Sequence, residues 1–139
     1  MTNEQCEFLK RVCKRPSMFV FTPEFDSVCA YIDGIHAATG CLTGFREWLI
    51  VHLDGGHNLI WQLLVKSRLQ NESIPKTKYI TSLGLIIEEF HRFTGPTTGG
   101  TNGLMRIYIR YHGWLLNQKW YKPDWSNYVP PYDGILNQE

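Results

Sequence analysis

A regular apolar stripe between residues 79 and 93 constrains the fold more than any other feature of this chain. Its members recur at spacings of three and four and are Tyr79, Leu83, Ile86, Ile87, Phe90 and Phe93. These spacings place side chains on one face of an α-helix, and Glu88 and Arg92 fall on the opposite face. The stripe predicts an amphipathic helix that starts near Pro75, ends at Gly95 and needs partners to cover its apolar face.

Two shorter stripes predict helices in the first part of the chain. Residues 3–14 carry one, which ends before the Arg-Pro pair because the residue before a proline avoids helical geometry. The second helix is expected to have Thr22 as its N-cap, Pro23 at its first position and Glu24 opposing its dipole. Gly40 is expected to end it.

Two later segments leave alternatives open. A unit that starts at Thr43 is interrupted by "DGGHN" (54–58) before its apolar pattern resumes. Since a glycine costs about 1 kcal/mol in a helix interior, this unit is either one kinked helix or two helices. Residues 104–120 fit a helix and, at their start, also a strand. Their length favours a helix that is buried on most sides.

The run "MFVF" (18–21) lies between two prolines. It suits a core strand, the lip of a binding site or a packed connector between helices. Because proline limits the helices on both sides, we interpret residues 15–21 as a connector whose aromatic rings fill the gap between them. A short buried strand is the alternative.

The chain as a whole is predicted to be all-α. Its 139 residues suffice for one hydrophobic core, and no convincing set of strands accompanies the helical patterns. We expect a compact single-domain bundle of five to six helices over residues 1–139. The aromatic- and proline-rich C-terminal extension "YKPDWSNYVPPYDGILNQE" (121–139) is expected to wrap this body.

Several signals are missing from the sequence. A run of about 18 apolar residues and an export signal are both absent, which predicts a cytoplasmic protein without membrane contact. Motifs for nucleotide, metalloprotease and hydrolase chemistry are also absent, so we expect no enzyme activity, no cofactor and no metal. In that compartment free thiols are expected for the four cysteines, which form no CxxC pair and are Cys6, Cys13, Cys29 and Cys41.

Histidines supply the remaining catalytic candidates. Asp54 and His57 flank two glycines, where an acid and an imidazole could serve a small hydrolase. No nucleophile or metal ligand accompanies them, so this hypothesis is weak. His36 and His52 fall on apolar stripes, which favours hydrogen-bonded core histidines over ligands.

Local charge is stronger than the net charge of +1 suggests. Asp26, Ala30, Asp33 and Ala37 are spaced along one helical stripe of short side chains, which can present carboxylates to a basic partner. Residues 104–122 hold four cations and no acid, and an alternative function is a helical nucleic-acid-binding module built on this segment. Its expected contacts are Arg106, Arg110, Lys119 and Lys122 with Tyr108, Tyr111 and Trp120.

Four segments carry short motifs, namely "RPSMF" (15–19), "YIDGIHAATG" (31–40), "GFREWL" (44–49) and "NLIWQLL" (58–64). In these the chain resembles a group of small bacterial immunity proteins that accompany polymorphic or contact-dependent growth-inhibition toxins. The resemblance covers roughly residues 14–65 and extends more loosely through "LGLIIEEFHRF".

The resemblance implies a cytoplasmic antitoxin without catalytic residues. It would be a monomer that forms a 1:1 heterodimer with a cognate toxin domain, expected to be a basic nuclease such as an RNase, and occludes its active site without binding nucleic acid itself. Arg15, Pro16, Trp48 and Trp61 match the motifs and are interpreted as packing and turn residues. The expected toxin-binding residues are the acids Glu24, Asp26, Asp33, Asp54, Glu88 and Glu89.

Overall fold

The computed structural model describes residues 1–95 and 103–122, and in these ranges the chain forms helices and no strand. The α-helices are α1 (Asn3–Lys14), α2 (Phe25–Thr39), α3 (Phe45–Leu53), α4 (Trp61–Asn71), α5 (Tyr79–Thr94) and α6 (Gly103–Leu116). Two 3-10 turns, η1 (Pro16–Met18) and η2 (Lys76–Lys78), precede the loop to α2 and the start of α5. The predicted all-α class is confirmed, and the alternative strands at 15–21 and 104–111 are absent.

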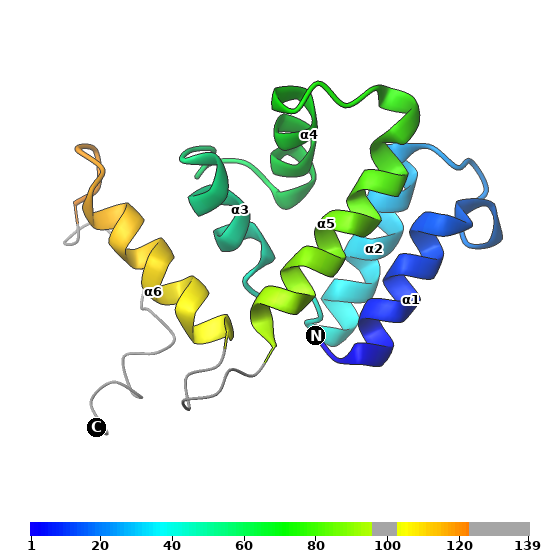
Figure 1. The fold of residues 1–139 in the computed structure, drawn as a ribbon, viewed down its shortest axis with the longest axis horizontal. Coiled ribbons are helices and arrows are strands. Elements are labelled where there is room, and N and C mark those ends of the chain that lie inside the picture. The colour runs from blue at the N-terminus through cyan, green and yellow to red at the C-terminus, as the bar shows by residue number, and fades with distance from the viewer. Residues whose placement is uncertain (96–102, 123–139) are drawn as a thin grey trace.

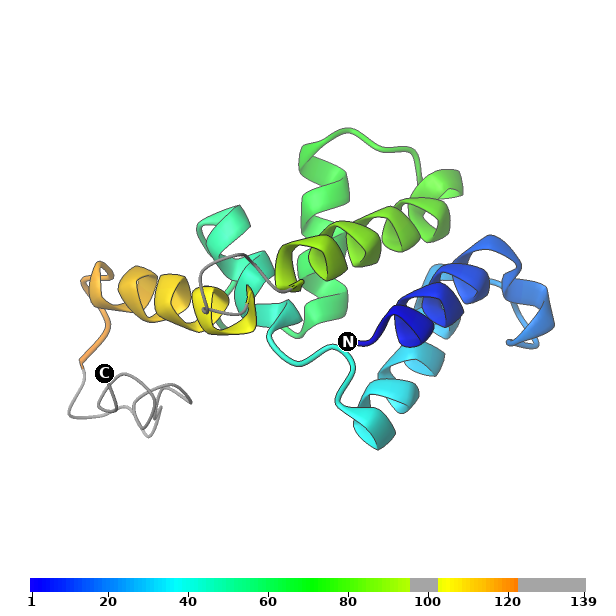
Figure 2. The same cartoon turned by 60° about the horizontal axis from the view of Figure 1, so that its bottom comes forward.

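The helices form two groups. One consists of α1, α2 and α5 and the other of α3, α4 and α6, and α5 joins them through its contacts with α4 and α6. Figure 1 shows α1, α2 and α5 together on one side of the molecule, and Figure 2 shows the same grouping after rotation. The most extensive helix contact joins α1 to α5, followed by the contacts of α3 with α6 and with α4. Consequently α6 lies at the far end, held mainly by α3.

Phe45 is the centre of the hydrophobic core. Its side chain is fully buried, and its ring centroid lies 5.1 Å from that of Phe90 on α5 and 5.7 Å from that of Trp61 on α4. Trp48 stacks on Phe45 at 5.9 Å. Such tilted and offset ring pairs add about 0.5–1.5 kcal/mol each beyond the burial of their area, so three helices are joined at one point.

The ends of α2 differ in part from the prediction. The helix begins at Phe25, with Glu24 as an N-cap that makes no side-chain capping bond. The predicted capping role of Thr22 and the helical position of Pro23 are therefore wrong, because the helix starts two residues later. Gly40 ends the helix as predicted, with a φ of 69° in the left-handed region that favours glycine.

The glycine break separates two helices, α3 and α4, which decides that alternative. Asp54 and Gly56 both adopt positive φ, 53° and 79°, so the chain reverses and cannot continue as one helix. Arg46 holds the returning segment, because its guanidinium donates hydrogen bonds to the carbonyl oxygens of Leu59 and His57.

α6 is helical as predicted, but two details of that prediction are wrong. Only one stripe is buried, formed by Gly103, Ile107, Tyr111 and Leu115, because α3 covers a single side of it. The helix also ends at Leu116 and not at Trp120. The predicted extension lies, apart from Tyr121 and Lys122, outside the described residues.

The "MFVF" run divides between the core and solvent. Phe19 packs edge-on against Phe8 of α1, with ring centroids 5.5 Å apart, and also contacts Tyr31 of α2, so it fills the gap between helices as predicted. Met18 and Phe21, in contrast, are 68% and 105% exposed. Only the inner half of this run is therefore a packed connector.

Over the described ranges, no helix is both long enough and apolar enough to cross a lipid bilayer.

Gly84 and Gly34 provide a matched test of helix packing. A Cβ at Gly84 would lie 3.0 Å from the Cβ of Cys13, whereas one at Gly34 would meet nothing within 4 Å. We expect Gly84→Leu to lower the free energy of unfolding by about 2–3 kcal/mol through overpacking. Gly34→Leu is expected to leave it unchanged or raise it by up to about 1 kcal/mol. Urea denaturation of both variants measures the difference, and equal effects would contradict the close approach of α1 and α5.

Candidate functional site

A cleft of about 420 Å³ opens where α2, α3, α4 and α6 meet. We call it the Asp33–Glu47 cleft after its two carboxylates. Its lining consists of Asp33, His36, Leu42, Thr43, Gly44, Arg46, Glu47, Ile60, Trp61, Gln62 and Tyr108. Most of these residues belong to three of the four segments on which the predicted resemblance rests, so segments separated in the sequence contribute to one surface feature.

One wall of the cleft is fixed by a bond between α2 and α4. The indole nitrogen of Trp61 donates to a carboxylate oxygen of Asp33 at 2.9 Å. Trp61 is only 7% exposed, and its ring packs on Phe45. Asp33 is therefore positioned by the aromatic core, with its second oxygen left for other partners.

Glu47 lies on the opposite side, near Tyr108 of α6. Burial first, and the charge of Glu47 second, raise the pKa of the Tyr108 hydroxyl. This hydroxyl stays protonated at neutral pH and can donate a hydrogen bond. Glu47 is half-buried, and no cation pairs with it in the described part of the chain.

His36 and Gln62 complete the polar lining. The Nδ1 atom of His36 accepts a hydrogen bond from the backbone N–H of Leu42 at 3.1 Å, so the neutral imidazole carries its proton on Nε2. The Oε1 atom of Gln62 is buried and has no partner within the described residues. Among the described residues, the lining holds two carboxylates against one guanidinium, that of Arg46, which is engaged by backbone carbonyls. The cleft is therefore negatively charged and suited to a hydrogen-bond-donating cation.

The other predicted toxin-binding acids lie elsewhere. Glu24 and Asp26 border a separate hollow of about 580 Å³ at the start of α2. The carboxylate of Asp26 is 81% exposed and pairs with the Lys66 ammonium at 3.0 Å. The acidic stripe of α2 is thus divided, since Asp26 contacts a cation and Asp33 contacts an indole.

Glu88 and Glu89 on α5 also have partners within the protein. Glu88 lies 3.4 Å from the Lys10 ammonium of α1. Glu89 receives a hydrogen bond from the Arg68 guanidinium of α4 at 2.8 Å, and Arg68 also lies over the ring of Trp48. These carboxylates tie α5 to its neighbours.

Asp54 and His57, the residues of the hydrolase hypothesis, are exposed, and each contacts an aromatic side chain from α6 or the turn that follows it. Asp54 accepts a hydrogen bond from the Trp114 indole at 2.7 Å. The imidazole of His57 stacks on Trp120, with centroids 4.0 Å apart. Both residues therefore hold α6 and its following turn against the glycine break.

The remaining histidine prediction is half correct. His36 is partly buried and hydrogen-bonded, as expected. His52 is exposed, so its prediction as a core histidine is wrong. It shares a helix face with Trp48 and its ring contacts the Trp48 ring, but it stands in the last turn of α3, where the neighbouring helices leave it exposed.

The cations predicted to bind nucleic acid partly serve α6 itself. Arg106 and Arg110 both lie 5.1 Å from the centroid of the Phe93 ring, and Arg106 donates to the Phe93 carbonyl oxygen at 2.9 Å. Tyr111 is buried, whereas Trp120 is 47% exposed. Lys119 is exposed. The segment therefore offers fewer free cations than its sequence suggests.

Comparison with family models, curated proteins and solved structures gave no match. Within the described residues, no group of three or more histidine, cysteine, aspartate or glutamate side chains is arranged to hold a metal ion.

The sequence-based predictions named Asp33 as a contact and Tyr108 only as a nucleic-acid contact, and they missed Glu47 and Gln62. Glu47 stands inside the "GFREWL" motif, and the Gln62 side chain follows the motif tryptophan directly. Both residues could have been predicted from their position next to a motif tryptophan, since Glu47 precedes Trp48 and Gln62 follows Trp61. A buried tryptophan holds the residues beside it where the core meets the surface.

The four cysteines are free and buried. Burial raises the pKa of the Cys13 and Cys29 thiols to about 12, far above the ordinary value of about 8.5. Since the thiolate is the reactive form, we expect both to resist Ellman's reagent in the native protein at about pH 8 and to react at once in guanidinium. Mass spectrometry identifies the labelled residues, and rapid native labelling of Cys13 or Cys29 would contradict this.

The Trp61–Asp33 bond is expected to appear as coupling in a double-mutant cycle. The single variants are Trp61→Phe and Asp33→Ala. The double variant should lose about 1 kcal/mol less unfolding free energy than the sum of the losses in the two single variants. The matched control replaces Asp33→Ala by Asp26→Ala, two turns earlier on α2, where we expect coupling below about 0.5 kcal/mol. Urea denaturation gives all the free energies, and equal coupling at both positions would exclude the bond.

Proposed function

We propose that this chain is an immunity protein that binds and neutralises a cognate toxin domain through the Asp33–Glu47 cleft. The observation that supports the proposal is the convergence of three resemblance segments on that cleft. Packing the core of a helical bundle does not require these segments to share a surface feature, whereas a binding site does. Asp33, Glu47 and Trp61, one from each segment, line it together.

The chemistry of the cleft favours a lysine or arginine side chain of the toxin as its occupant. Asp33 and Glu47 outnumber Arg46, the one lysine or arginine among the described residues of the lining, so the cleft is negatively charged, and their carboxylate oxygens accept hydrogen bonds. A guanidinium carries five N–H donors in a planar arrangement that suits several acceptors at once. A toxin that degrades nucleic acid needs such cations to hold phosphate, so a protein that engages them occludes its active site.

Apolar side chains next to the cleft add contact area. Ile60 and Leu63 at the start of α4 are 58% and 44% exposed. A stable complex buries roughly 800 Å² on each partner, which is more than the cleft alone supplies. The proposed interface therefore extends from the cleft over this edge of α4, and the complex is a 1:1 heterodimer of monomers in the cytoplasm.

The predicted contacts outside the cleft have a smaller part in this proposal. Asp26, Asp54, Glu88 and Glu89 each bind a cation or an indole of their own chain. What sets them apart from Asp33, which also binds an indole, is that none of them lines the cleft. Glu24 is exposed, and it borders the hollow at the other end of α2.

The direct test uses the toxin domain encoded by the reading frame immediately upstream. We expect calorimetry to detect a 1:1 complex and coexpression of this chain to protect cells from that domain. Glu47→Lys should weaken binding at least about tenfold, because it places like charges together, and the loss should be larger at low salt.

Glu4→Lys on α1 is the matched control for charge, since Glu4 lies in the first turn of α1 and outside the cleft. It should leave affinity within about twofold, as expected for an acid remote from the interface. Equal weakening by both variants would reject the cleft as the contact, and absence of both complex and protection would reject the immunity function.

A further inference from the structure

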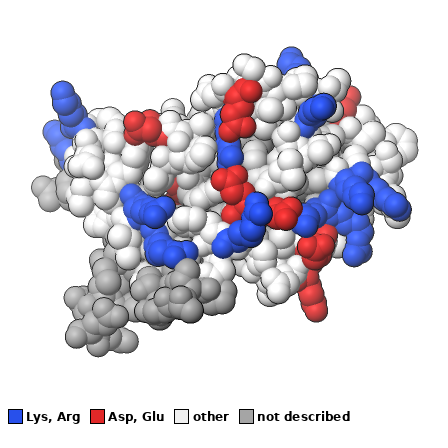
Figure 3. All heavy atoms as spheres, viewed as in Figure 1, with Lys and Arg blue, Asp and Glu red and all other residues white. Residues whose placement is uncertain are grey.

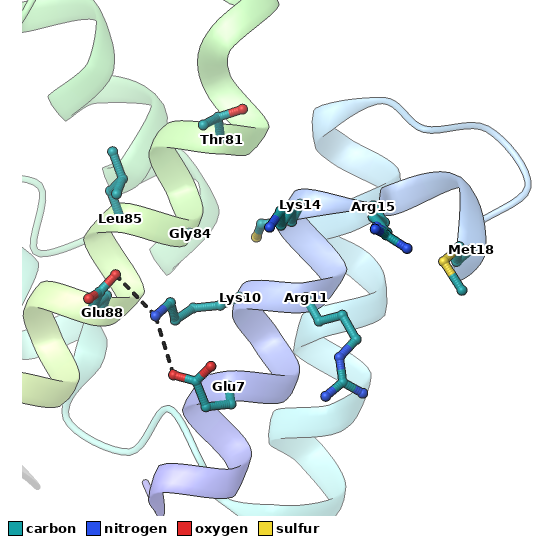
Figure 4. A pocket seen from close by; sticks show the side chains of 11 residues that line it. Glu7, Lys10, Arg11, Lys14, Arg15, Met18, Thr81, Gly84, Leu85 and Glu88 are labelled. Carbon is teal, nitrogen blue, oxygen red and sulfur yellow. Dashed lines mark hydrogen bonds and ion pairs between the residues drawn. The ribbon is translucent and has the colours of Figure 1, made fainter.

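Another hollow, of about 700 Å³, runs along α1 beside α5. We call it the α1–α5 groove. Figure 4 shows Lys10 pointing from α1 toward Glu88 of α5, with Lys14 further along α1, Arg11 pointing to the side of α1 away from α5, and Arg15 and Met18 beyond the end of α1. Cys13 and Gly84 form its floor, where the two helices approach most closely.

The charges of the groove are uneven along its length. At one end the Lys10 ammonium lies 3.3 Å from Glu7 and 3.4 Å from Glu88, so these charges largely compensate one another. Further along, Arg11, Lys14 and Arg15 have no carboxylate within ion-pair distance in the described ranges. Figure 3 shows lysine and arginine side chains gathered over this part of α1. This end of the groove is therefore strongly basic.

Large apolar side chains stand beside these cations. Met18 and Leu85 line the groove and are 68% and 63% exposed. Phe21, in the loop that follows η1, is 105% exposed. Apolar surface next to unpaired charge is typical of an interaction surface, because a solvated helix face gains nothing from exposing such side chains.

We propose that the α1–α5 groove binds an acidic segment of a partner protein that also carries bulky apolar side chains. Residues 7–14 of α1 span roughly 10 Å at 1.5 Å per residue, which suits about two turns of a helix. Carboxylates of the segment pair with Arg11, Lys14 and Arg15, and its apolar side chains cover Met18 and Leu85. This surface is separate from the Asp33–Glu47 cleft and does not depend on the function proposed for it.

A nucleic acid fits the groove less well than such a segment. Its regularly spaced phosphates would meet no unpaired cation at the Glu7–Glu88 end, where Lys10 is already paired, and would leave Met18 and Leu85 uncovered. Lys14 also stabilises the negative end of the α1 dipole. That role explains neither the exposed Met18 and Leu85 nor Arg15, which lies beyond the last helical residue.

Fluorescence anisotropy with a labelled amphipathic peptide of glutamate and leucine tests the proposal on the full chain. We expect saturable binding at about 50 mM salt that weakens as salt rises. The double variant Arg11→Glu, Lys14→Glu should weaken binding at least about tenfold, through repulsion of the peptide carboxylates. The control Lys76→Glu, Lys78→Glu makes the same charge change on η2 and should weaken it less than about threefold.

The apolar part of the proposal has its own readout. The double variant Met18→Ser, Leu85→Ser, at two exposed positions, should weaken binding of the glutamate–leucine peptide. It should leave the binding of a glutamate–serine peptide unchanged. Thermal denaturation of every variant verifies that it is folded. Equal loss in the η2 control, tighter binding of an oligothymidine than of the peptide, or no saturable peptide binding would each overturn the proposal.

Discussion

The contact on which the rest of the structure depends is the packing of Phe45 against Phe90 and Trp61. These rings come from α3, α5 and α4, so a single buried side chain fixes the relative placement of three helices. Trp61 extends this order to the surface, because its indole nitrogen is bonded to Asp33 of α2. The candidate cleft thus lies at the outer edge of the aromatic core, and its Asp33 carboxylate is held in place by a core residue.

Rigid placement matters for a protein that acts by binding. Side chains that are ordered before contact lose less conformational entropy when a partner arrives. Asp33 is held by an indole, Arg46 by two carbonyl oxygens, and His36 by a backbone N–H. Little reordering of this wall is therefore needed to receive a cation, which is the property expected of a tight inhibitor.

Helical periodicity predicted the elements well, and it predicted their ends and surroundings less well. The stripe from Tyr79 to Phe93 repeats often enough to specify a helix and its buried face. The start of α2 depends on one local choice between Thr22 and Glu24 as N-cap, which short-range patterns do not decide. Burial of α6 depends on how many neighbours reach it, and that is a property of the tertiary fold, which the sequence of α6 does not contain.

Charge patterns in the sequence misled for a related reason. Asp26 and Asp33 share a stripe of α2, yet α4 supplies Lys66 to one and Trp61 to the other. The cations of α1 were not among the predicted contacts, whereas those of residues 104–122 were. Arg106 and Arg110 lie against the Phe93 ring, while Arg11 and Lys14 line the α1–α5 groove.

Net charge is therefore a poor guide to the partners of this chain. Fields from exposed charges fade over roughly 8–10 Å at physiological salt, so an acidic cleft and a basic groove on one small domain act independently. A chain with a formal charge of +1 can engage a cationic side chain at one surface and an acidic segment at another. In both proposals the partner is inferred from the local charge of one surface and not from the net charge of the chain.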